Sequence, residues 1–207
     1  MNAPLTLTGV RRIHGRAVLT LSTGETLSMP RAMLRERPYR GGTPFDRESF
    51  NAFLRERAYP FAMEKAVALL ASRARTEKEV ADALLQNAYP EQIVARVIAQ
   101  LHEAGYLDDG DFAGQWAASR TARGLGERRI RMELRQKGVD PDTIERALSA
   151  VNEEKQMDGA LKAAQKAARG RDMTQRAEQQ KVLAALARRG YDYSVARAAL
   201  EQVLENR

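Results

Sequence analysis

The stretch that decides the fold is GERRIRMELRQKGVDPDTIERALSAV, residues 126–151. Its apolar positions recur at helical spacing on both sides of a turn at Gly138, which predicts a pair of helices. The same pattern occurs about 50 residues earlier and about 52 residues later, with no gap inside any copy. The aligned apolar positions begin with Val80, Ile130 and Val182 and end with Leu101, Val151 and Val203. Tandem copies of this length are typical of supersecondary units that bury a stripe against their neighbours.

Each copy also has room for a third helix ahead of the pair. Residues 111–122 hold Phe112 and Trp116 one helical turn apart, and residues 64–70 occupy the corresponding place in the first copy. The sequence therefore predicts a mainly α protein whose three tandem three-helix repeats form an elongated curved arc. We place these repeats at residues 61–107, 108–153 and 154–207.

Two helix starts support this division. Thr76 is followed three residues later by Glu79, which is the capping-box pattern that satisfies free backbone amides at a helix start. Gly126 occupies the equivalent position in the second copy, and glycine is an acceptable N-cap residue.

The first 60 residues carry the strand signals of the chain. Residues 16–21 alternate between apolar and polar side chains, residues 22–25 form a turn signal, and residues 26–29 and 5–13 can pair on either side. We expect a β-hairpin or small antiparallel sheet followed by linking helices: a short helix ahead of Pro38 and a longer one whose course is broken or bent by Pro60.

Composition excludes several classes of chemistry. The chain has 207 residues, no cysteine and two histidines, so it has no disulfide, no thiolate nucleophile and no sulfur ligand for zinc. His14 and His102 have no evident acid or nucleophile partner. No apolar run approaches the roughly 20 residues that span a bilayer. We expect a cytoplasmic protein that is not an enzyme, with no cofactor, no metal, no small-molecule substrate and no membrane contact.

Positive charge is unevenly distributed. The formal net charge is +7, which favours polyanionic partners. Residues 116–138 carry seven cations against two acids and residues 155–189 carry nine against three, whereas residues 61–107 carry five against six. The cations that we select as contact candidates are Arg120, Arg123, Arg128, Arg131, Arg135, Lys137, Lys181, Arg188 and Arg189.

Three of these arginines are predicted to share one helix face. Arg128, Arg131 and Arg135 are three and four residues apart, and Ile130 and Leu134 lie on a different face of the same helix. The planar guanidinium group binds carboxylates and phosphates in the same bidentate way. The stripe can therefore serve an acidic protein surface, a DNA backbone or both.

Other motifs favour structural roles. Phe112 and Trp116 lie beside alanines, which indicates a core and not a base-stacking platform. The acids at 108, 109 and 111 lack the remaining ligands of a calcium loop and instead suit a helix start. Residues 124–126, Gly-Leu-Gly, lack the Lys-Ser/Thr ending of a phosphate-binding loop.

A longer ordered pattern adds a family resemblance. It comprises Gly105-Tyr106-Leu107-Asp108-Asp109, Phe112-Ala113, Trp116, Arg120, Gly124-Leu125-Gly126, Ile130, Leu134 and Lys137-Gly138-Val139. This pattern resembles the most characteristic stretch of the RecX regulatory proteins. Residues 186–191, with Leu200, resemble the family's last repeat, and residues 66–101 are compatible with its first.

The resemblance implies tandem three-helix repeats and a partner, the filament of the RecA recombinase on DNA. It further implies a regulator that reduces ATP hydrolysis, strand exchange and coprotease activity without a catalytic site of its own. The arginine stripe leaves single- or double-stranded DNA open as a further partner through phosphate contacts. Two alternatives remain open. One is a helix-turn-helix transcriptional regulator, which the few cations on residues 91–102 disfavour. The other is a helical adaptor for another protein.

Overall fold

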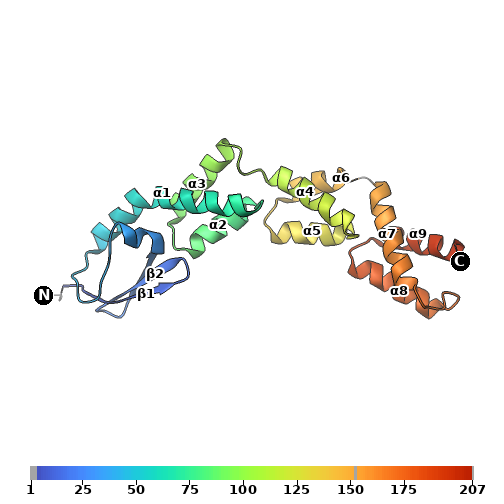
Figure 1. Cartoon of the computed structure of the whole chain (residues 1–207), viewed down its shortest axis with the longest axis horizontal. Helices are drawn as coiled ribbons and strands as arrows, with labels where there is room; N and C mark the ends of the chain where they lie inside the picture. The colour runs from blue at the N-terminus through green and yellow to red at the C-terminus, as the bar shows by residue number, and fades with distance from the viewer. Residues whose placement is uncertain (1–3, 152, 207) are drawn as a thin grey trace. The chain divides into compact units, whose positions relative to one another are not determined.

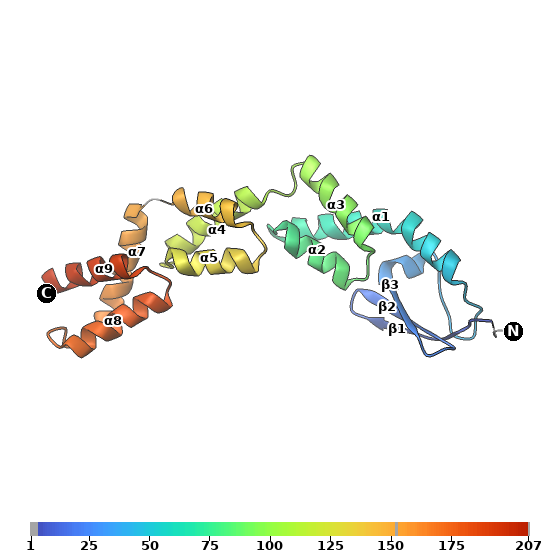
Figure 2. The ribbon, with the colours of Figure 1, turned by 180° about the vertical axis from the view of Figure 1, so that it is seen from behind.

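The computed structural model describes residues 4–151 and 153–206. Within these residues the chain contains a three-stranded sheet and nine α-helices (Figures 1 and 2). Contacts divide it into two compact units, Met1–Asp108 and Asp109–Arg207, which we call the N-terminal and C-terminal units. The mainly α class with a small antiparallel sheet at the start is confirmed.

The sheet of the N-terminal unit is a simple antiparallel meander. Its strands are β1 (Leu7–Ile13), β2 (Arg16–Leu21) and β3 (Thr26–Pro30), in the spatial order β1-β2-β3. In the central strand, Leu19 and Leu21 are almost fully buried and Thr20 is half-buried. Ala17 and Val18 are buried as well, so β2 is covered over most of its length, and all three strands lie where the sequence predicted them. The strand prediction is therefore confirmed.

The helices of the N-terminal unit begin with a short 3-10 helix, η1 (Arg31–Arg35), at the place where a short helix was expected. Helix α1 (Arg47–Ser72) follows, capped by the Asp46 carboxylate, which accepts from the backbone amides of residues 48 and 49. Helices α2 (Glu77–Gln86) and α3 (Glu91–Glu103) complete the unit. All of these elements contribute side chains to one continuous core.

Of the two effects expected at Pro60, a break or a bend, the break is wrong, because α1 runs without interruption across it. Proline has no amide hydrogen, so the carbonyl of Glu56 receives no helix hydrogen bond from it. Glu56 and Pro60 are both exposed, and water can therefore satisfy that carbonyl. On the opposite side Ala58 and Ala62 are fully buried and hold both halves of the helix against the core. The boundary expected between residues 60 and 61 falls inside this helix.

The C-terminal unit contains six helices and two cores. The helices are α4 (Asp109–Ala122), α5 (Glu127–Gln136), α6 (Pro141–Ser149), α7 (Glu153–Ala168), α8 (Arg176–Arg188) and α9 (Tyr193–Glu205). One core joins α4, α5 and α6, and the other joins α7, α8 and α9. The three-helix composition of the second and third repeats is thereby confirmed.

The register of the repeats is also confirmed. Val80, Ile130 and Val182, which align in the sequence, are all fully buried. The helix starts are as predicted: Thr76 and Glu79 form a complete capping box, and Gly126 is the N-cap residue of α5. No helix within the described residues is both long and apolar enough to cross a lipid bilayer.

Candidate interaction surface

Helix α5 carries three arginines along one exposed side, which we call the α5 arginine stripe. Its members, Arg128, Arg131 and Arg135, line a shallow groove of ≈ 470 Å³ together with Met132 and Gln136. Met132 is 40% exposed and so places an apolar side chain among these cations. Arginine and methionine are both enriched in protein interfaces, so the groove has the composition of a contact surface.

The opposite face of α5 explains why the stripe points outward. Ile130 and Leu134 are fully buried in the core of the second repeat. Arginine and core positions alternate along the helix at the spacing expected for an amphipathic helix. The sequence prediction of one cationic face and one core face is therefore correct.

Two arginines of the stripe already have partners inside the chain. Arg131 donates from Nε and Nη2 to the two carboxylate oxygens of Glu145, at 2.8 and 3.0 Å, and joins α5 to α6. This hydrogen bonding raises the pKa of Arg131 and holds the pKa of Glu145 below its usual value. Arg128 pairs with Asp192, the N-cap residue of α9. Arg135 is exposed and has no ion pair within residues 4–151 and 153–206.

A carboxylate behind the stripe organises another part of the predicted site. Glu133 accepts from Arg120 Nε at 2.8 Å, Trp116 Nε1 at 3.1 Å and Arg129 Nε at 3.2 Å. Burial raises the pKa of Glu133, but the hydrogen bonds from Arg120 and Arg129 outweigh burial, and the net pKa is lowered. The Arg120 guanidinium also lies 3.9 Å from the Trp116 ring centroid. Arg120 is therefore engaged in holding α4 against α5.

Lys137 lies on the same aromatic cluster. Its Nζ is 4.3 Å from the Trp116 ring centroid and 5.4 Å from that of Phe112, within the range of a cation–π interaction. The two rings are stacked, with centroids 5.5 Å apart. Phe112 is a core residue, as predicted, and Trp116 packs half-buried at the edge of that core.

The second and third repeats meet through their backbones. The amide of Gly126 donates to the carbonyl of Arg189, and the amide of Arg128 donates to the carbonyl of Gly190, both at 3.0 Å. A Cβ atom on Gly126 would lie 2.4 Å from the carbonyl carbon of Gly190. Arg189 Nη1 also donates to the carbonyl of Gly124, at 3.2 Å. The junction places α5 and the start of α9 in one fixed arrangement.

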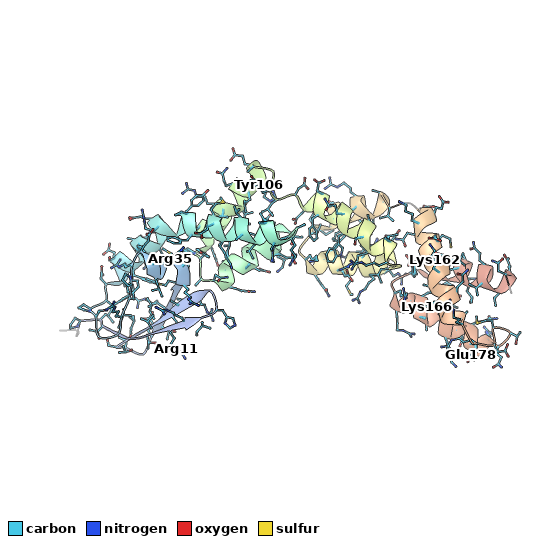
Figure 3. All side chains as sticks on the ribbon, viewed as in Figure 1. Arg11, Arg35, Tyr106, Lys162, Lys166 and Glu178 are labelled. Carbon is cyan, nitrogen blue, oxygen red and sulfur yellow. The ribbon has the colours of Figure 1, made fainter. Side chains whose placement is uncertain are left out.

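The remaining predicted contact residues do not join the stripe. Arg123 and Arg189 line a second groove elsewhere in the C-terminal unit. Lys181 pairs with Glu178 on α8, whose position Figure 3 marks. Arg188 is exposed in the last turn of α8. The structure thus sorts the nine candidates into an exposed stripe, a second groove, an aromatic cluster and the surface of α8.

The arrangement of these side chains suits a binding surface better than a catalytic or metal site. Within the described residues no three His, Asp or Glu side chains are grouped so that they could hold a metal ion. His102 Nε2 lies 2.9 Å from a carboxylate oxygen of Glu77, and both side chains are exposed. Asp109 and Asp111 lie in the first turn of α4, where carboxylates stabilise the helix dipole.

The helix pair α5–α6 does not favour a base-reading role. In a helix-turn-helix protein the N-terminal residues of the second helix approach the bases and the neighbouring phosphates. Here that helix begins beside three exposed acids, Asp140, Asp142 and Glu145. Their charge would repel the DNA backbone.

Sequence reasoning missed two features of the site. The first is the role of Glu133, because its three donors are brought together only when α4 packs against α5. The second is a row of lysines on α7, Lys155, Lys162 and Lys166, which were counted as charge but not assigned to a face. Their spacing of seven and four residues was a usable signal, because it keeps all three on one helix face.

Comparisons with known proteins agree on one family. Residues 62–101, 108–148 and 153–200 match the models of the first, second and third three-helix domains of RecX. The "Regulatory protein RecX" of Mycobacterium sp. (strain KMS) is 38% identical over 137 residues, which cover 62% of this chain and 73% of the relative. That of Bacillus velezensis is 36% identical over 148 residues, 68% of this chain and 54% of the relative. The chain thus spans about half the length of the Bacillus relative.

Solved structures show the same architecture. A structure described as "Crystal structure of regulatory protein RecX" has a TM-score of 0.65 at 23% identity and covers 95% of this chain and 99% of its own. RecX from Lactobacillus salivarius has a TM-score of 0.65 at 22% identity and covers 70% of this chain and 95% of its own. At this level of identity the likeness concerns the fold.

Proposed function

Because the chain belongs to the RecX family of regulatory proteins, we propose that it binds the nucleoprotein filament of the RecA recombinase and reduces ATP hydrolysis, strand exchange and coprotease activity. It acts by binding, with no catalytic step of its own. This role requires access to DNA, so we expect the protein in the cytoplasm.

The observation that carries the proposal is the α5 arginine stripe. Arg135 has no ion pair among the described residues, and Met132 beside it is exposed, so the centre of the groove is available to a partner. Arg128 and Arg131 are held in fixed positions by their carboxylate partners. Side chains that are already ordered lose less conformational entropy when they bind. The stripe is therefore preorganised for an acidic surface.

The first test is the single-stranded-DNA-dependent ATPase activity of the cognate RecA, titrated with this protein. DNA is kept in excess so that sequestration of DNA cannot imitate inhibition. We expect activity to fall at less than one molecule per RecA protomer. No inhibition, together with no co-sedimentation with the filament, would refute the proposal.

The second test isolates the stripe. Reversing all three arginine charges is expected to weaken filament binding, but it also places like charges beside Asp192 and Glu145. The variant Arg135→Glu is a milder change, because it adds one like charge near Glu145 but breaks no ion pair within the described residues. We expect it to weaken filament binding about tenfold while helicity is unchanged.

The matched control is Arg176→Glu. Arg176 is exposed in the first turn of α8, so the variant carries the same change of charge at a position where an acid suits the helix dipole. It should bind the filament like the unmodified protein. Equal weakening in both variants would mean that only net charge matters and that the stripe is not the contact.

Salt dependence separates protein contacts from DNA contacts. If cations of this chain neutralise phosphates, the logarithm of the binding constant should fall by roughly one power of salt concentration for each phosphate contacted. We expect a shallower slope for the stripe, because an acidic protein surface releases fewer condensed counterions. A slope that becomes less steep by about one in Arg135→Glu would instead assign Arg135 to a phosphate.

A further inference from the structure

A second groove lies within the C-terminal unit, separate from the α5 arginine stripe. It has a volume of ≈ 690 Å³ and is bounded by one face of α4, the C-terminal end of α6 and one face of α7. It has no lining residue in common with the groove of the stripe. A volume of this size is within the usual range of ligand-binding pockets.

The floor of this groove is aliphatic and made of small side chains. Ala118 and Ala122 come from α4, Ala147 from α6, Val151 from the segment that follows it, and Ala163 from α7. Small side chains leave space at the floor, and they offer water no hydrogen-bond partner. The floor therefore favours an aliphatic side chain of a ligand.

One polar group in the wall lacks a partner. Thr121 is 5% exposed, and its hydroxyl makes no hydrogen bond to any residue that the structure describes. A buried hydroxyl without a partner costs free energy, and a ligand group that reached it would recover that cost. Thr121 lies among the residues that line the groove, although its hydroxyl oxygen is covered by neighbouring atoms.

The rim of the groove is cationic. Lys155, Lys162 and Lys166 lie along one face of α7, which Figure 3 marks at the last two of these residues. From Lys155 to Lys166, 11 residues further along, the helix rises about 16 Å. Lys162 pairs with Asp158 at 2.7 Å, whereas Lys155 and Lys166 have no ion pair in the described part of the chain.

Two arginines add to this charge. Arg189 is held by its hydrogen bond to the carbonyl of Gly124, and Arg123 is exposed. The lining therefore has five cations and a single acid, Asp158, which Lys162 already neutralises. An aliphatic floor with cations in its lining is complementary to a segment that carries aliphatic side chains flanked by carboxylates.

We propose that this groove binds an acidic peptide segment of a partner protein, with aliphatic side chains against the alanine floor and carboxylates facing Lys155, Lys166 and Arg123. A nucleic acid strand fits less well, because no aromatic side chain lines the groove and bases need such platforms for stacking. The inference does not depend on recombinase binding, because the stripe and the groove share no residue.

The test uses a fluorescein-labelled helical peptide of about 12 residues, a length that matches the row of lysines. It has Leu at every third or fourth position and Glu elsewhere, and its twin has Gln in place of each Glu. We measure binding to the full chain by fluorescence anisotropy. The acidic peptide should bind at least about tenfold more tightly than the twin, since each exposed charge pair contributes modestly.

Two variants and one control locate the site. Lys155→Gln with Lys166→Gln should weaken binding of the acidic peptide about tenfold, and Ala118→Phe, at an exposed lining position, should abolish it by filling the floor. The control, Arg169→Gln with Arg176→Gln, removes the same charge from exposed positions outside the groove and should bind normally.

Three results would overturn the inference. They are no binding of the acidic peptide, equal binding of its neutral twin, or equal loss in the lysine pair and in its control. An oligothymidylate of equal charge that binds more tightly than the peptide, and loses affinity in the lysine pair, would assign the groove to nucleic acid. None of these results bears on the ATPase test, so the two proposals succeed or fail separately.

Discussion

The three arginines of the α5 stripe look alike in the sequence, but their surroundings differ. Arg131 has a two-pronged hydrogen bond to Glu145, Arg128 has a partner on α9, and Arg135 has no ion pair in the described residues. Periodicity predicted that all three share a face, because facing depends only on spacing. Periodicity could not predict which of the arginines forms an ion pair, because the partners Glu145 and Asp192 lie 14 and 64 residues further along the chain.

At the same scale, Gly126 is required for a different reason than helix capping. Its φ of −82° is open to any residue, but a Cβ atom would lie 2.4 Å from backbone atoms of Gly190 and Tyr191. Backbone cannot move aside cheaply, so we expect Gly126→Ala to destabilise the C-terminal unit by about 1–3 kcal/mol. Urea unfolding followed by circular dichroism measures this loss.

The control is Gly114→Ala. Gly114 lies inside α4, and a Cβ atom there would meet nothing within 4 Å. Alanine in a helix interior is more stable than glycine, so this variant should gain about 0.5–1 kcal/mol. If both variants lost stability equally, the close approach at Gly126 would not be the cause.

Glu133 gives a prediction with a defined pH dependence. Its folded-state pKa is lowered, so it stabilises the fold above the usual value of 4.5, and that contribution is lost as the pH falls through the lowered pKa. We expect Glu133→Gln to cost about 1–3 kcal/mol at neutral pH, because Arg120 keeps a partly buried charge without its carboxylate. The difference in free energy of unfolding between Glu133→Gln and the unmodified protein should become smaller at acidic pH.

Unfolding by urea at neutral pH and at about pH 3 tests this expectation. The comparison variant is Glu145→Gln, whose side chain is 53% exposed and which should lose less than about 1 kcal/mol. A gap between Glu133→Gln and the unmodified protein that stayed constant with pH would contradict the assigned role of the carboxylate.

At the scale of elements, helix α1 tests how the environment of a proline decides its effect. Pro60→Ala restores an amide hydrogen to the carbonyl of Glu56, so we expect a gain of about 1–3 kcal/mol in the free energy of unfolding. Thermal unfolding is the measurement. Pro141→Ala is the matched change at the first position of α6, where proline suits a helix. Pro141→Ala should not raise the free energy of unfolding. An increase equal to that of Pro60→Ala would indicate that both substitutions act through the unfolded chain.

The elements also show what sequence can and cannot predict. The aligned positions at Val80, Ile130 and Val182 predicted the helix pairs, because burial imposes a period that any sequence must obey. The break expected at Pro60 was wrong, since the exposure of one carbonyl depends on tertiary packing. The groove beside Lys155 escaped notice because its floor comes from three separate helices and its alanines have no distinctive pattern.

On the scale of the whole molecule, each unit has cores of its own. The core of the N-terminal unit ends with Leu107, and the cores of the C-terminal unit begin with Phe112. Directly before Leu107, Tyr106 is 69% exposed and lies outside any helix. We therefore expect brief chymotrypsin treatment to cut first after Tyr106 and to leave two helical fragments.

Mass spectrometry identifies the cut, and circular dichroism of the separated fragments tests their folding. Tyr193 is the comparison site, because it is 65% exposed but lies at the start of α9. First cleavage at Tyr193 would contradict the expected order of cleavage, and unfolding of either fragment after cleavage at Tyr106 would show that the two units do not fold independently.

The contact between Gly126 and Gly190 also constrains how the two positions can change during evolution. A Cβ atom on Gly126 would meet backbone atoms of Gly190 and Tyr191, and a Cβ atom on Gly190 would meet Arg129, so neither position can change alone without disturbing the docking of two repeats. A lineage that replaced one glycine would have to rebuild the whole junction. The two glycines, 64 residues apart, are therefore expected to be retained or replaced together during evolution. Among related chains, their joint presence should mark those whose second and third repeats dock in this way.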